Sequence, residues 1–290
     1  MRTASRPRSN RGDGITLPDD APRPRALTIA GSDSGGGAGI QADLKTFTAL
    51  GVFGTTAITA VTIQNTNGVS GYEELSPGTV AEQIRAVVTD IGVDAAKTGM
   101  LASAAIVTAV ADAIVETQVT DLVVDPVFVS KHGHPLLAPD AVEALRDRIL
   151  PLATLVTPNL PEAAGLTGLT VESRDDMRKA GDAILGFGPR AVLVKGGHLE
   201  GGGADDLFVD ASGERWIEGE RIDTPNTHGT GCVLSAAIAA YLARGEALIG
   251  AVELGKRFVT EAIRNALAIG HGIGPVDPAW GIGGISSRLA

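Results

Sequence analysis

The sequence is poor in cysteine and in aromatic residues. Cys232 is the one cysteine among 290 residues, which excludes an internal disulfide framework and indicates a reducing compartment, the cytoplasm. Aromatic residues make up 3% of the chain, so its core must be built from Ala, Val, Leu and Ile. No apolar segment follows the N-terminal arginines, which argues against a secretory signal. The charge-free span 46–72 holds glycines, Gln64 and asparagines, which a membrane segment disfavours.

Positive charge is also scarce, and it is concentrated at one end. The chain has 24 basic and 34 acidic side chains, a net charge of −10. Residues 1–25 hold six Arg, three Asp and four Pro, which predicts a flexible basic extension. Residues 26–290, predicted to form a single domain, therefore carry 18 basic and 31 acidic groups, a net charge of −13. This acidic body argues against a nucleic-acid surface, which needs clustered Lys and Arg.

Two common nucleotide-binding motifs are missing. The Gly-rich segment 31–39 follows a strand and opens a helix, but its spacing does not fit G-x-G-x-x-G. This excludes an NAD-linked oxidoreductase of the usual type. No G-x-x-x-x-G-K-[ST] phosphate loop occurs either. The segment is then either a structural turn or a loop over a small substrate, with Asp33 and Asp43 as polar contacts.

Strand and helix patterns alternate along the body of the chain. Strands are predicted at 26–30, 55–63, 95–97, 121–125, 154–156 and 191–195, with a hairpin or antiparallel pair within 206–222. Helices are predicted at 39–50, 79–90, 103–117, 139–150, 160–166, 174–187, 231–243 and 249–268. Strands that are apolar without alternation are covered on both faces. The pattern predicts an α/β fold with a mostly parallel sheet, helices on both faces and a small antiparallel extension. Ligands of such sheets bind beyond the carboxyl ends of the strands.

The segment 226–232 predicts an anion site. Gly229 and Gly231 allow the backbone to approach a ligand closely, and a helix that begins there directs unpaired N–H groups at it. The field at a helix start is equivalent to about half a positive charge. Cys232 lies within this field, so its thiol is expected to lose its proton more easily than free cysteine. The alternative is a Gly-rich turn with a small residue packed at a helix start.

Three other loops carry candidate residues, each with a structural alternative. Asn159 and Glu162 fit the N-cap and N3 positions of a capping box, and their oxygens also suit a phosphate-bound Mg²⁺. Lys195 precedes two glycines at a strand end, which suits either a phosphate tail or a plain turn. Gln64 ends an apolar strand, where its amide offers a donor and an acceptor to a heterocycle edge or simply terminates the strand.

Together these segments resemble the hydroxymethylpyrimidine/phosphomethylpyrimidine kinases of thiamine biosynthesis, within the ribokinase-like superfamily. The resemblance runs from residue 26 to about residue 275 and rests on segments 27–34, 36–46, 64–66, 97–101, 157–163, 195–198 and 226–232. It implies a ribokinase-like fold and a homodimer. It also implies ATP- and Mg²⁺-dependent phosphorylation of 4-amino-5-hydroxymethyl-2-methylpyrimidine, then of its monophosphate to the diphosphate.

The resemblance assigns a role to each candidate residue. On the substrate side, Gln64 would bind the pyrimidine edge, and the pocket would be lined by Gly31, Asp43 and Met100. On the phosphate side, Asn159 and Glu162 would organise Mg²⁺ through water, and Lys195 would meet the nucleotide tail. The anion hole would be formed by Gly229, Thr230 and Gly231. Cys232 takes the place of the Asp that serves as base in many ribokinase-like sugar kinases, so it is the expected base here.

The chain departs from some relatives in the loop after residue 125. Ser130 stands where relatives with pyridoxal kinase activity carry a second Cys, which disfavours covalent capture of pyridoxal, and His134 replaces an acidic residue. His132 and His134 lack a third ligand at a metal-site spacing, so a mobile loop is the favoured interpretation. A vitamin B6 kinase and a non-catalytic pyrimidine or nucleotide sensor remain as alternatives. The sequence leaves no room after the kinase match for the thiamine-phosphate synthase domain fused in some relatives.

Overall fold

The computed structural model of the protein describes residues 22–128, 139–197 and 203–282. Within them a nine-stranded sheet has the order β3-β2-β1-β4-β5-β6-β7-β8-β9. The strands are β1 (Arg25–Ser32), β2 (Phe53–Asn65), β3 (Gly68–Glu74), β4 (Ala95–Thr98), β5 (Leu122–Val124), β6 (Leu155–Val156), β7 (Ala191–Val194), β8 (Asp206–Asp210) and β9 (Gly213–Ile217). The six strands β2, β1, β4, β5, β6 and β7 pair in parallel. Strand β3 at one edge and the β8–β9 hairpin at the other are antiparallel.

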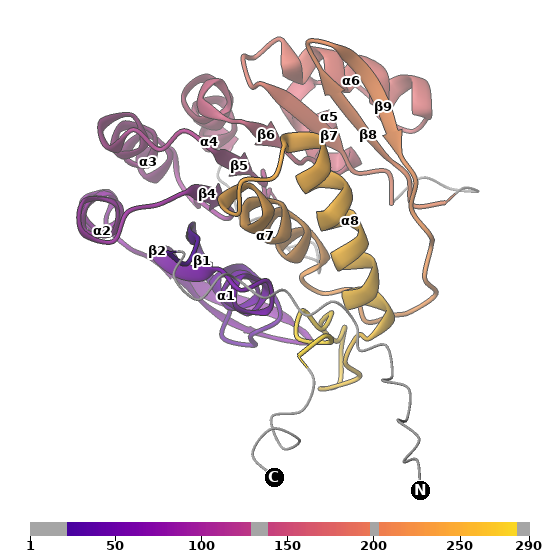
Figure 1. Ribbon diagram of the computed structural model, residues 1–290, viewed down its shortest axis with the longest axis horizontal. Helices are drawn as coiled ribbons and strands as arrows, with labels where there is room; N and C mark the ends of the chain where they lie inside the picture. The colour runs from indigo at the N-terminus through magenta and orange to yellow at the C-terminus, as the bar shows by residue number, and fades with distance from the viewer. Residues whose placement is uncertain (1–21, 129–138, 198–202, 283–290) are drawn as a thin grey trace, which may run out of the picture.

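Helices cover both faces of the sheet (Figure 1). They are α1 (Gly39–Ala49), α2 (Pro77–Asp90), α3 (Ala104–Thr117), α4 (Pro139–Ala144), α5 (Leu160–Thr167), α6 (Arg174–Leu185), α7 (Thr230–Ala243) and α8 (Leu248–Arg264). One apolar cluster joins the sheet to α1, α7 and α8, and the other joins it to α2 through α6. The predicted mostly parallel sheet with two helical layers is therefore confirmed.

Helix α7 is the most enclosed helix of the first layer. Its alanines allow it to lie between the sheet and α8, and nearly every residue from Val233 to Leu242 is buried. The approach to α8 is close, because a Cβ atom placed on Gly255 would lie 2.7 Å from Ile238 Cγ1. Tight packing against the sheet and α8 fixes the position of α7, and with it the position of its first turn. The beginning of α7 is the part of the helix that faces the candidate site.

The structure differs from the sequence-based expectations at several ends and edges. Strand β3 was not predicted, since its glycines and serine obscure the apolar alternation that marks a strand. The helix expected over 139–150 is divided into α4, a π-helical turn at Leu145–Ile149 and a 3₁₀ turn at Leu150–Leu152. Helix α8 ends at Arg264 rather than at residue 268. Arg25, placed in the N-terminal extension, lies in β1 and pairs with Asp94 at 2.7 Å.

A search of the described helices for a membrane-crossing segment found none of sufficient length and apolarity.

Candidate active site

A cavity of about 680 Å³ lies beside the carboxyl ends of the parallel strands. It brings together residues that are widely separated in the sequence. Of the residues named from the sequence, its walls include Gly31, Gln64, Met100, Asn159, Glu162, Lys195, Gly229, Thr230, Gly231 and Cys232. The substrate-side and phosphate-side candidates therefore line one cavity. The approach is close at Gly31, where an added Cβ would lie 3.1 Å from Met100 Sδ.

Asp43 is the exception, and its expected place in the pocket wall is corrected. The side chain of Asp43 is fully buried in α1, where Lys97 Nζ donates to both carboxylate oxygens at 3.1 Å. Thr28 Oγ1 donates to the same carboxylate at 2.7 Å. A carboxylate this enclosed needs such partners, because burial of an unpaired charge is costly. Asp43 therefore stabilises the fold below the cavity, while Lys97 borders the cavity itself.

Helix α7 begins at Thr230, one residue before the predicted start. Gly229 caps α7 with a φ of 82°, a left-handed conformation that favours glycine. Thr230 Oγ1 donates to Thr227 O at 2.8 Å and closes the turn before the helix. The turn also packs against the Gly-rich loop, since a Cβ on Gly229 would lie 1.8 Å from Gly37 O. An added Cβ at Gly37 would also clash, at 2.5 Å from His228 Cδ2. The two loops consequently fit together only if Gly229 and Gly37 both lack a side chain.

The expectation that Cys232 has a lowered pKa is wrong. Burial, which disfavours the charged thiolate, raises the pKa of Cys232 to about 12. The positive charge of Lys97 and an N–H group of Gly39 act in the opposite direction, but Asp43 and Asp125 oppose them. Desolvation therefore outweighs the field at the helix start. Cys232 is half-buried in the cavity wall and carries its proton at neutral pH.

Asn159 and Glu162 form the capping box predicted from the sequence. Glu162 N donates to Asn159 Oδ1 and Asn159 N donates to Glu162 Oε2, each at 2.8 Å. Each side-chain oxygen retains a lone pair that the cap does not use. Both residues also border the cavity. The cap thus fixes the orientation of two side-chain oxygen atoms and leaves each able to bind a further ligand.

A buried charge cluster lies next to this cap. Lys195 Nζ lies 2.9 Å from Asp125 Oδ1 and 3.8 Å from Glu162 Oε2. Burial disfavours charge on Glu162, and with Asp125 nearby the pKa of Glu162 rises to about 7 despite Lys195. Burial has the same effect on Asp125, but Lys195 and Lys97 hold the pKa of Asp125 below its usual value. Two carboxylates here face one lysine, so the cluster has room for added positive charge.

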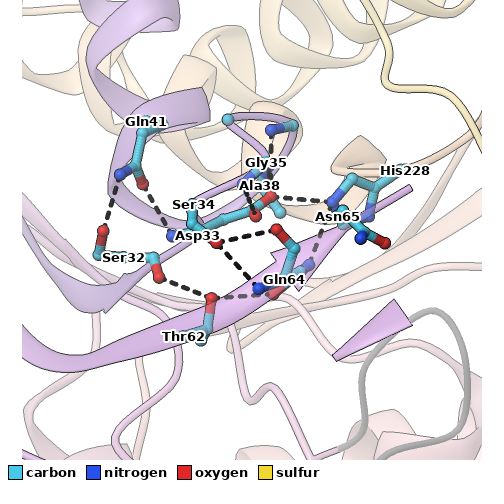
Figure 2. A network of polar contacts seen from close by, with 12 residues as sticks. Ser32, Asp33, Ser34, Gly35, Ala38, Gln41, Thr62, Gln64, Asn65 and His228 are labelled. Atoms are coloured by element: carbon cyan, nitrogen blue, oxygen red, sulfur yellow. Dashed lines mark hydrogen bonds and ion pairs between the residues drawn. The ribbon is translucent and has the colours of Figure 1, made fainter. Parts of the chain in front are cut away.

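The end of the cavity around Gln64 contains a polar network (Figure 2). His228 Nε2 lies 2.9 Å from Asp33 Oδ2, and the terminal amide of Gln64 lies 3.3 Å from His228 Nε2. The other end of the same amide lies 3.3 Å from Thr62 Oγ1. Asp33 also accepts N–H groups of the Gly-rich loop. The side chain of Gln64 therefore lies between Thr62 of the same strand, β2, and the loop that precedes α7.

The segment after α8 supports the loop before α7. His228 N donates to Gly274 O, and Val276 N donates to His228 O, each at 3.1 Å. Gly274 N donates to Asn226 Oδ1 at 3.1 Å. These bonds form a short parallel bridge between the loop and the residues around Pro275. The position of the backbone before α7 thus depends on residues more than forty positions downstream.

Comparison with known proteins identifies the chain. A family model described as phosphomethylpyrimidine kinase matches residues 33–277. The chain belongs to this family. It is 54% identical over 260 residues to the hydroxymethylpyrimidine/phosphomethylpyrimidine kinase of Streptomyces coelicolor, covering 90% of this chain and 96% of that protein. The resemblance noted from the sequence is therefore confirmed, and the protein is a kinase.

Solved structures agree with this placement. A phosphomethylpyrimidine kinase from Clostridium difficile shares 46% identity with a TM-score of 0.74, covering 82% of this chain and 99% of that one. An ADP complex of Bacillus subtilis pyridoxal kinase shares 40% identity with a TM-score of 0.83, covering 93% and 100%. The fold of the phosphomethylpyrimidine kinase family is thus shared with a relative named pyridoxal kinase.

Several residues of this kinase site received no role from the sequence. Lys97 and Asp125 border the cavity. Each could have been found from the sequence as a charged residue within or directly after a buried apolar strand. His228 lies inside a motif in which only the glycines, Thr230 and Cys232 were given roles. Lys256 and Asp206, paired at 2.6 Å, also border the cavity. Lys256 gives no signal, because it is one of several polar positions on the amphipathic α8.

The loop residues Ser130, His132 and His134, and also His198, lie outside the described residues. Among the described residues, no group of three or more His, Cys, Asp or Glu side chains is arranged to hold a metal ion.

Proposed function

We propose that this kinase uses ATP and Mg²⁺ to phosphorylate 4-amino-5-hydroxymethyl-2-methylpyrimidine and then its monophosphate. The observation that carries the proposal is one cavity in which Gln64, the start of α7 and the Lys195 cluster all face the same space. A phosphoryl-transfer enzyme needs a holder for the acceptor, donors for the transferring phosphoryl group and a clamp for the nucleotide phosphates. The cavity supplies one of each.

Gln64 supports the choice of acceptor. Its amide can offer a hydrogen-bond donor and an acceptor side by side, which matches the amino group and the ring nitrogen of an aminopyrimidine. Gly31 and Met100 form an apolar and closely packed wall beside it. A flat heterocycle would lie against this wall with its hydroxymethyl group directed toward α7.

The beginning of α7 supports the phosphoryl-transfer step. Backbone N–H groups at Gly229, Thr230 and Gly231 present partial positive charge where negative charge accumulates in the transition state. Cys232 follows directly and is proposed to take the proton of the attacking hydroxyl. Since its pKa is about 12 without ligands, Cys232 can accept that proton only as a thiolate, after its own proton has been lost to solvent in a bound complex that lowers the pKa. The loose transition state of phosphoryl transfer makes only a modest demand on this base.

The charge cluster supports Mg²⁺ as the metal. Mg²⁺ in kinases is held by one or two carboxylates together with substrate phosphates and water. Glu162 and Asp125 are two such carboxylates near a single lysine, and a bound cation would offset the burial that raises the pKa of Glu162. The donor set therefore fits Mg²⁺, with Glu162 and Asn159 as water-mediated or direct ligands. Bound Mg²⁺ would neutralise phosphate charge, and Lys195 would bind the nucleotide tail.

Product analysis by mass spectrometry tests this function. Purified protein would be incubated with ATP, Mg²⁺ and, separately, the hydroxymethylpyrimidine, its monophosphate and pyridoxal. Diphosphate formed from the first two compounds, with little pyridoxal phosphate, supports the proposal. Absence of turnover with any of them overturns it and favours a non-catalytic sensor.

Vitamin B6 phosphorylation is the second candidate function. The similarity to Bacillus subtilis pyridoxal kinase, at 40% identity and a TM-score of 0.83, favours it specifically. Efficient formation of pyridoxal phosphate in the same assay would place this activity first.

A cytoplasmic homodimer is also proposed. The β2–β3 edge exposes an apolar strip, since Val61, Ile63 and Tyr72 are 48%, 64% and 38% exposed. A second copy could bury this strip. Light scattering after size exclusion measures the mass, and a strictly monomeric species at working concentration contradicts the dimer.

A further inference from the structure

Asp206 and Lys256 form a buried ion pair in the cavity wall that the proposed function does not use. Lys256 Nζ lies 2.6 Å from Asp206 Oδ2, and the two side chains are 12% and 3% exposed. Asp206 begins β8 and Lys256 lies on α8, so the pair joins the sheet to a helix that covers it. A buried ion pair is weak evidence for stability, because the desolvation of both charges offsets their attraction. Its place beside the cavity indicates a role in the site.

The second oxygen of Asp206 binds the backbone directly after Lys195. Gly196 N donates to Asp206 Oδ1 at 3.0 Å. Lys195 N donates to Pro158 O at 2.8 Å, so hydrogen bonds fix the peptide groups on both sides of Lys195. The backbone also packs closely here, since a Cβ on Gly196 would clash with Asp205 O. Asp206 thus helps to fix the position from which the Lys195 side chain extends.

The ammonium group of Lys256 has a hydrogen beyond those that its bonds in the fold require. It donates to Asp206 Oδ2 and to Ala204 O, each at 2.6 Å. A lysine ammonium carries three hydrogens, so these two bonds leave one that a ligand in the cavity can accept. The side chain has little freedom to move, because a Cβ on Gly219 would lie 2.6 Å from Lys256 Cε. Lys256 is therefore a fixed cation in the cavity wall.

Asp206 consequently lies between two cations of the same cavity. Burial raises the pKa of Asp206 overall, whereas Lys256, the Gly196 N–H group and the charge of Lys195 act in the opposite direction. Both carboxylate oxygens face N–H donors, an arrangement that only an ionised carboxylate satisfies fully. A nucleotide tail carries negative charge on successive phosphate groups. Two ammonium groups that are fixed before the tail arrives bind it better than one, because less freedom is lost on binding.

We propose that Asp206 is a positioning residue for the nucleotide, whose two carboxylate oxygens hold the amide behind Lys195 and the ammonium group of Lys256 so that both lysines meet the phosphate tail. The proposal rests on the nucleotide-binding role of Lys195 proposed above. Asp206 acts through the two cations and needs no contact with the tail, whose negative charge it would repel. Its loss should therefore weaken nucleotide binding more than it slows the bound complex.

Asp206→Asn tests the proposal. The carbonyl oxygen of the new side chain can still accept from Gly196 N, but its NH₂ group then faces Lys256 Nζ, and two donors cannot bond to each other. Lys256 is released as a result. We expect KM for ATP and the calorimetric dissociation constant of ADP to rise about tenfold, the effect of one lost charge-assisted hydrogen bond. The kcat at saturating ATP and the affinity for the hydroxymethylpyrimidine should stay within about twofold of the wild type.

The Asp206→Asn/Lys256→Met double variant separates positioning from stability. It contains no unpaired buried charge, so it should fold even if Asp206→Asn is unstable. It also lacks the second cation, so its KM for ATP should be raised at least as much as that of Asp206→Asn. An ion pair that serves the fold alone would give a double variant with the wild-type KM for ATP.

Asp205→Asn is the matched control. Asp205 is the neighbouring residue, pairs with Arg174 and accepts from Gly219 N at 3.0 Å, and it is not among the described residues that border the cavity. The substitution removes an ion pair from the same turn. Its KM for ATP and its dissociation constant for ADP should equal those of the wild type, and urea denaturation gives the stability of every variant.

The outcomes separate this inference from the proposed function. Wild-type KM for ATP in folded Asp206→Asn and in the double variant overturns the role of Asp206, and so does an equal loss in every kinetic parameter. A wild-type protein that binds no ADP and consumes no ATP overturns the role of Lys195 and, with it, this inference. Raised KM for ATP in both variants, with wild-type values in Asp205→Asn, supports the positioning role.

Discussion

Lys195 Nζ lies 2.9 Å from Asp125 Oδ1. This ion pair connects the residue that follows β7 with the residue that follows β5, in the wall of the cavity. The two side chains are 14% and 3% exposed, so each neutralises a charge that water cannot reach. Glu162 approaches the same lysine from α5. Burial raises the pKa of Glu162 to about 7, while Lys195 and Lys97 hold the pKa of Asp125 below its usual value, and this difference is the basis of two of the following predictions.

Lys195→Met is expected to impair both stability and catalysis. It leaves Asp125 buried without its closest cation, which typically costs about 3 kcal/mol in the free energy of unfolding. Loss of the proposed phosphate contact should lower kcat/KM for ATP by about 100-fold or more. Urea denaturation and steady-state kinetics measure the two effects. Lys179→Met is the control, since that lysine is 68% exposed and should change stability by less than about 0.5 kcal/mol.

Glu162 should make the stability of the ligand-free protein depend on pH. Its pKa is raised from an unfolded value near 4.5 to about 7, so its contribution is fully present below pH 4.5 and is lost as pH rises through 7. Relative to Glu162→Gln, which keeps the capping box, the wild type should lose on the order of 2 kcal/mol between pH 5 and pH 8. Added Mg²⁺ should reduce this loss. Parallel stability curves for the two proteins would contradict the raised pKa.

Cys232 should react slowly with iodoacetamide in the folded, ligand-free protein. Burial raises its pKa to about 12, so the thiolate fraction stays small up to at least pH 10. As the chain has a single cysteine, loss of free thiol reports on this residue alone. The same protein in denaturant is the reference and should react with an ordinary thiol pKa. A plateau in the folded rate below pH 9 would show that the helix field prevails over burial.

Cys232→Ala should reduce turnover far more than substrate affinity. If the Cys232 thiolate accepts the hydroxyl proton, removal of this side chain should lower kcat by about 100-fold or more while the dissociation constant of the pyrimidine changes little. Single-turnover kinetics and calorimetric binding separate these quantities. Near wild-type kcat would leave Cys232 as a packing residue at the start of α7.

The Asp43–Lys97 pair should contribute to folding rather than to substrate binding. Lys97→Met leaves the Asp43 carboxylate buried with Thr28 as its remaining neutral partner, and we expect a loss of about 3–5 kcal/mol. The Asp43→Asn/Lys97→Met double variant should recover much of this loss, because no unpaired charge remains. Denaturant unfolding of the single and double variants gives the coupling energy. Additive losses would contradict the pairing.

The sequence was a good guide where a local pattern determines the outcome. The alternation of apolar runs determines the sheet and both helical layers, and the Asn159–Glu162 spacing determines the capping box, because both depend on neighbouring residues. The site depends on distant partners instead. Asp43 is paired with Lys97, fifty-four positions away in the sequence. The electric field at the start of α7 could be predicted from the local sequence, but the desolvation that raises the pKa of Cys232 comes from the surrounding structure and could not. Strand β3 forms because β2 offers it an edge, which its own sequence does not reveal.

The support of His228 by Gly274 and Val276 has a consequence for how the enzyme can be divided. A fragment covering residues 22–264 would contain Gln64, the Lys195 cluster and all of α7, yet it would lack the segment that pairs with the loop before α7. Such a fragment would keep the chemical groups and lose the scaffold that orders them. Truncation after α8 is therefore expected to abolish order in the loop before α7 even though every residue of that loop is retained.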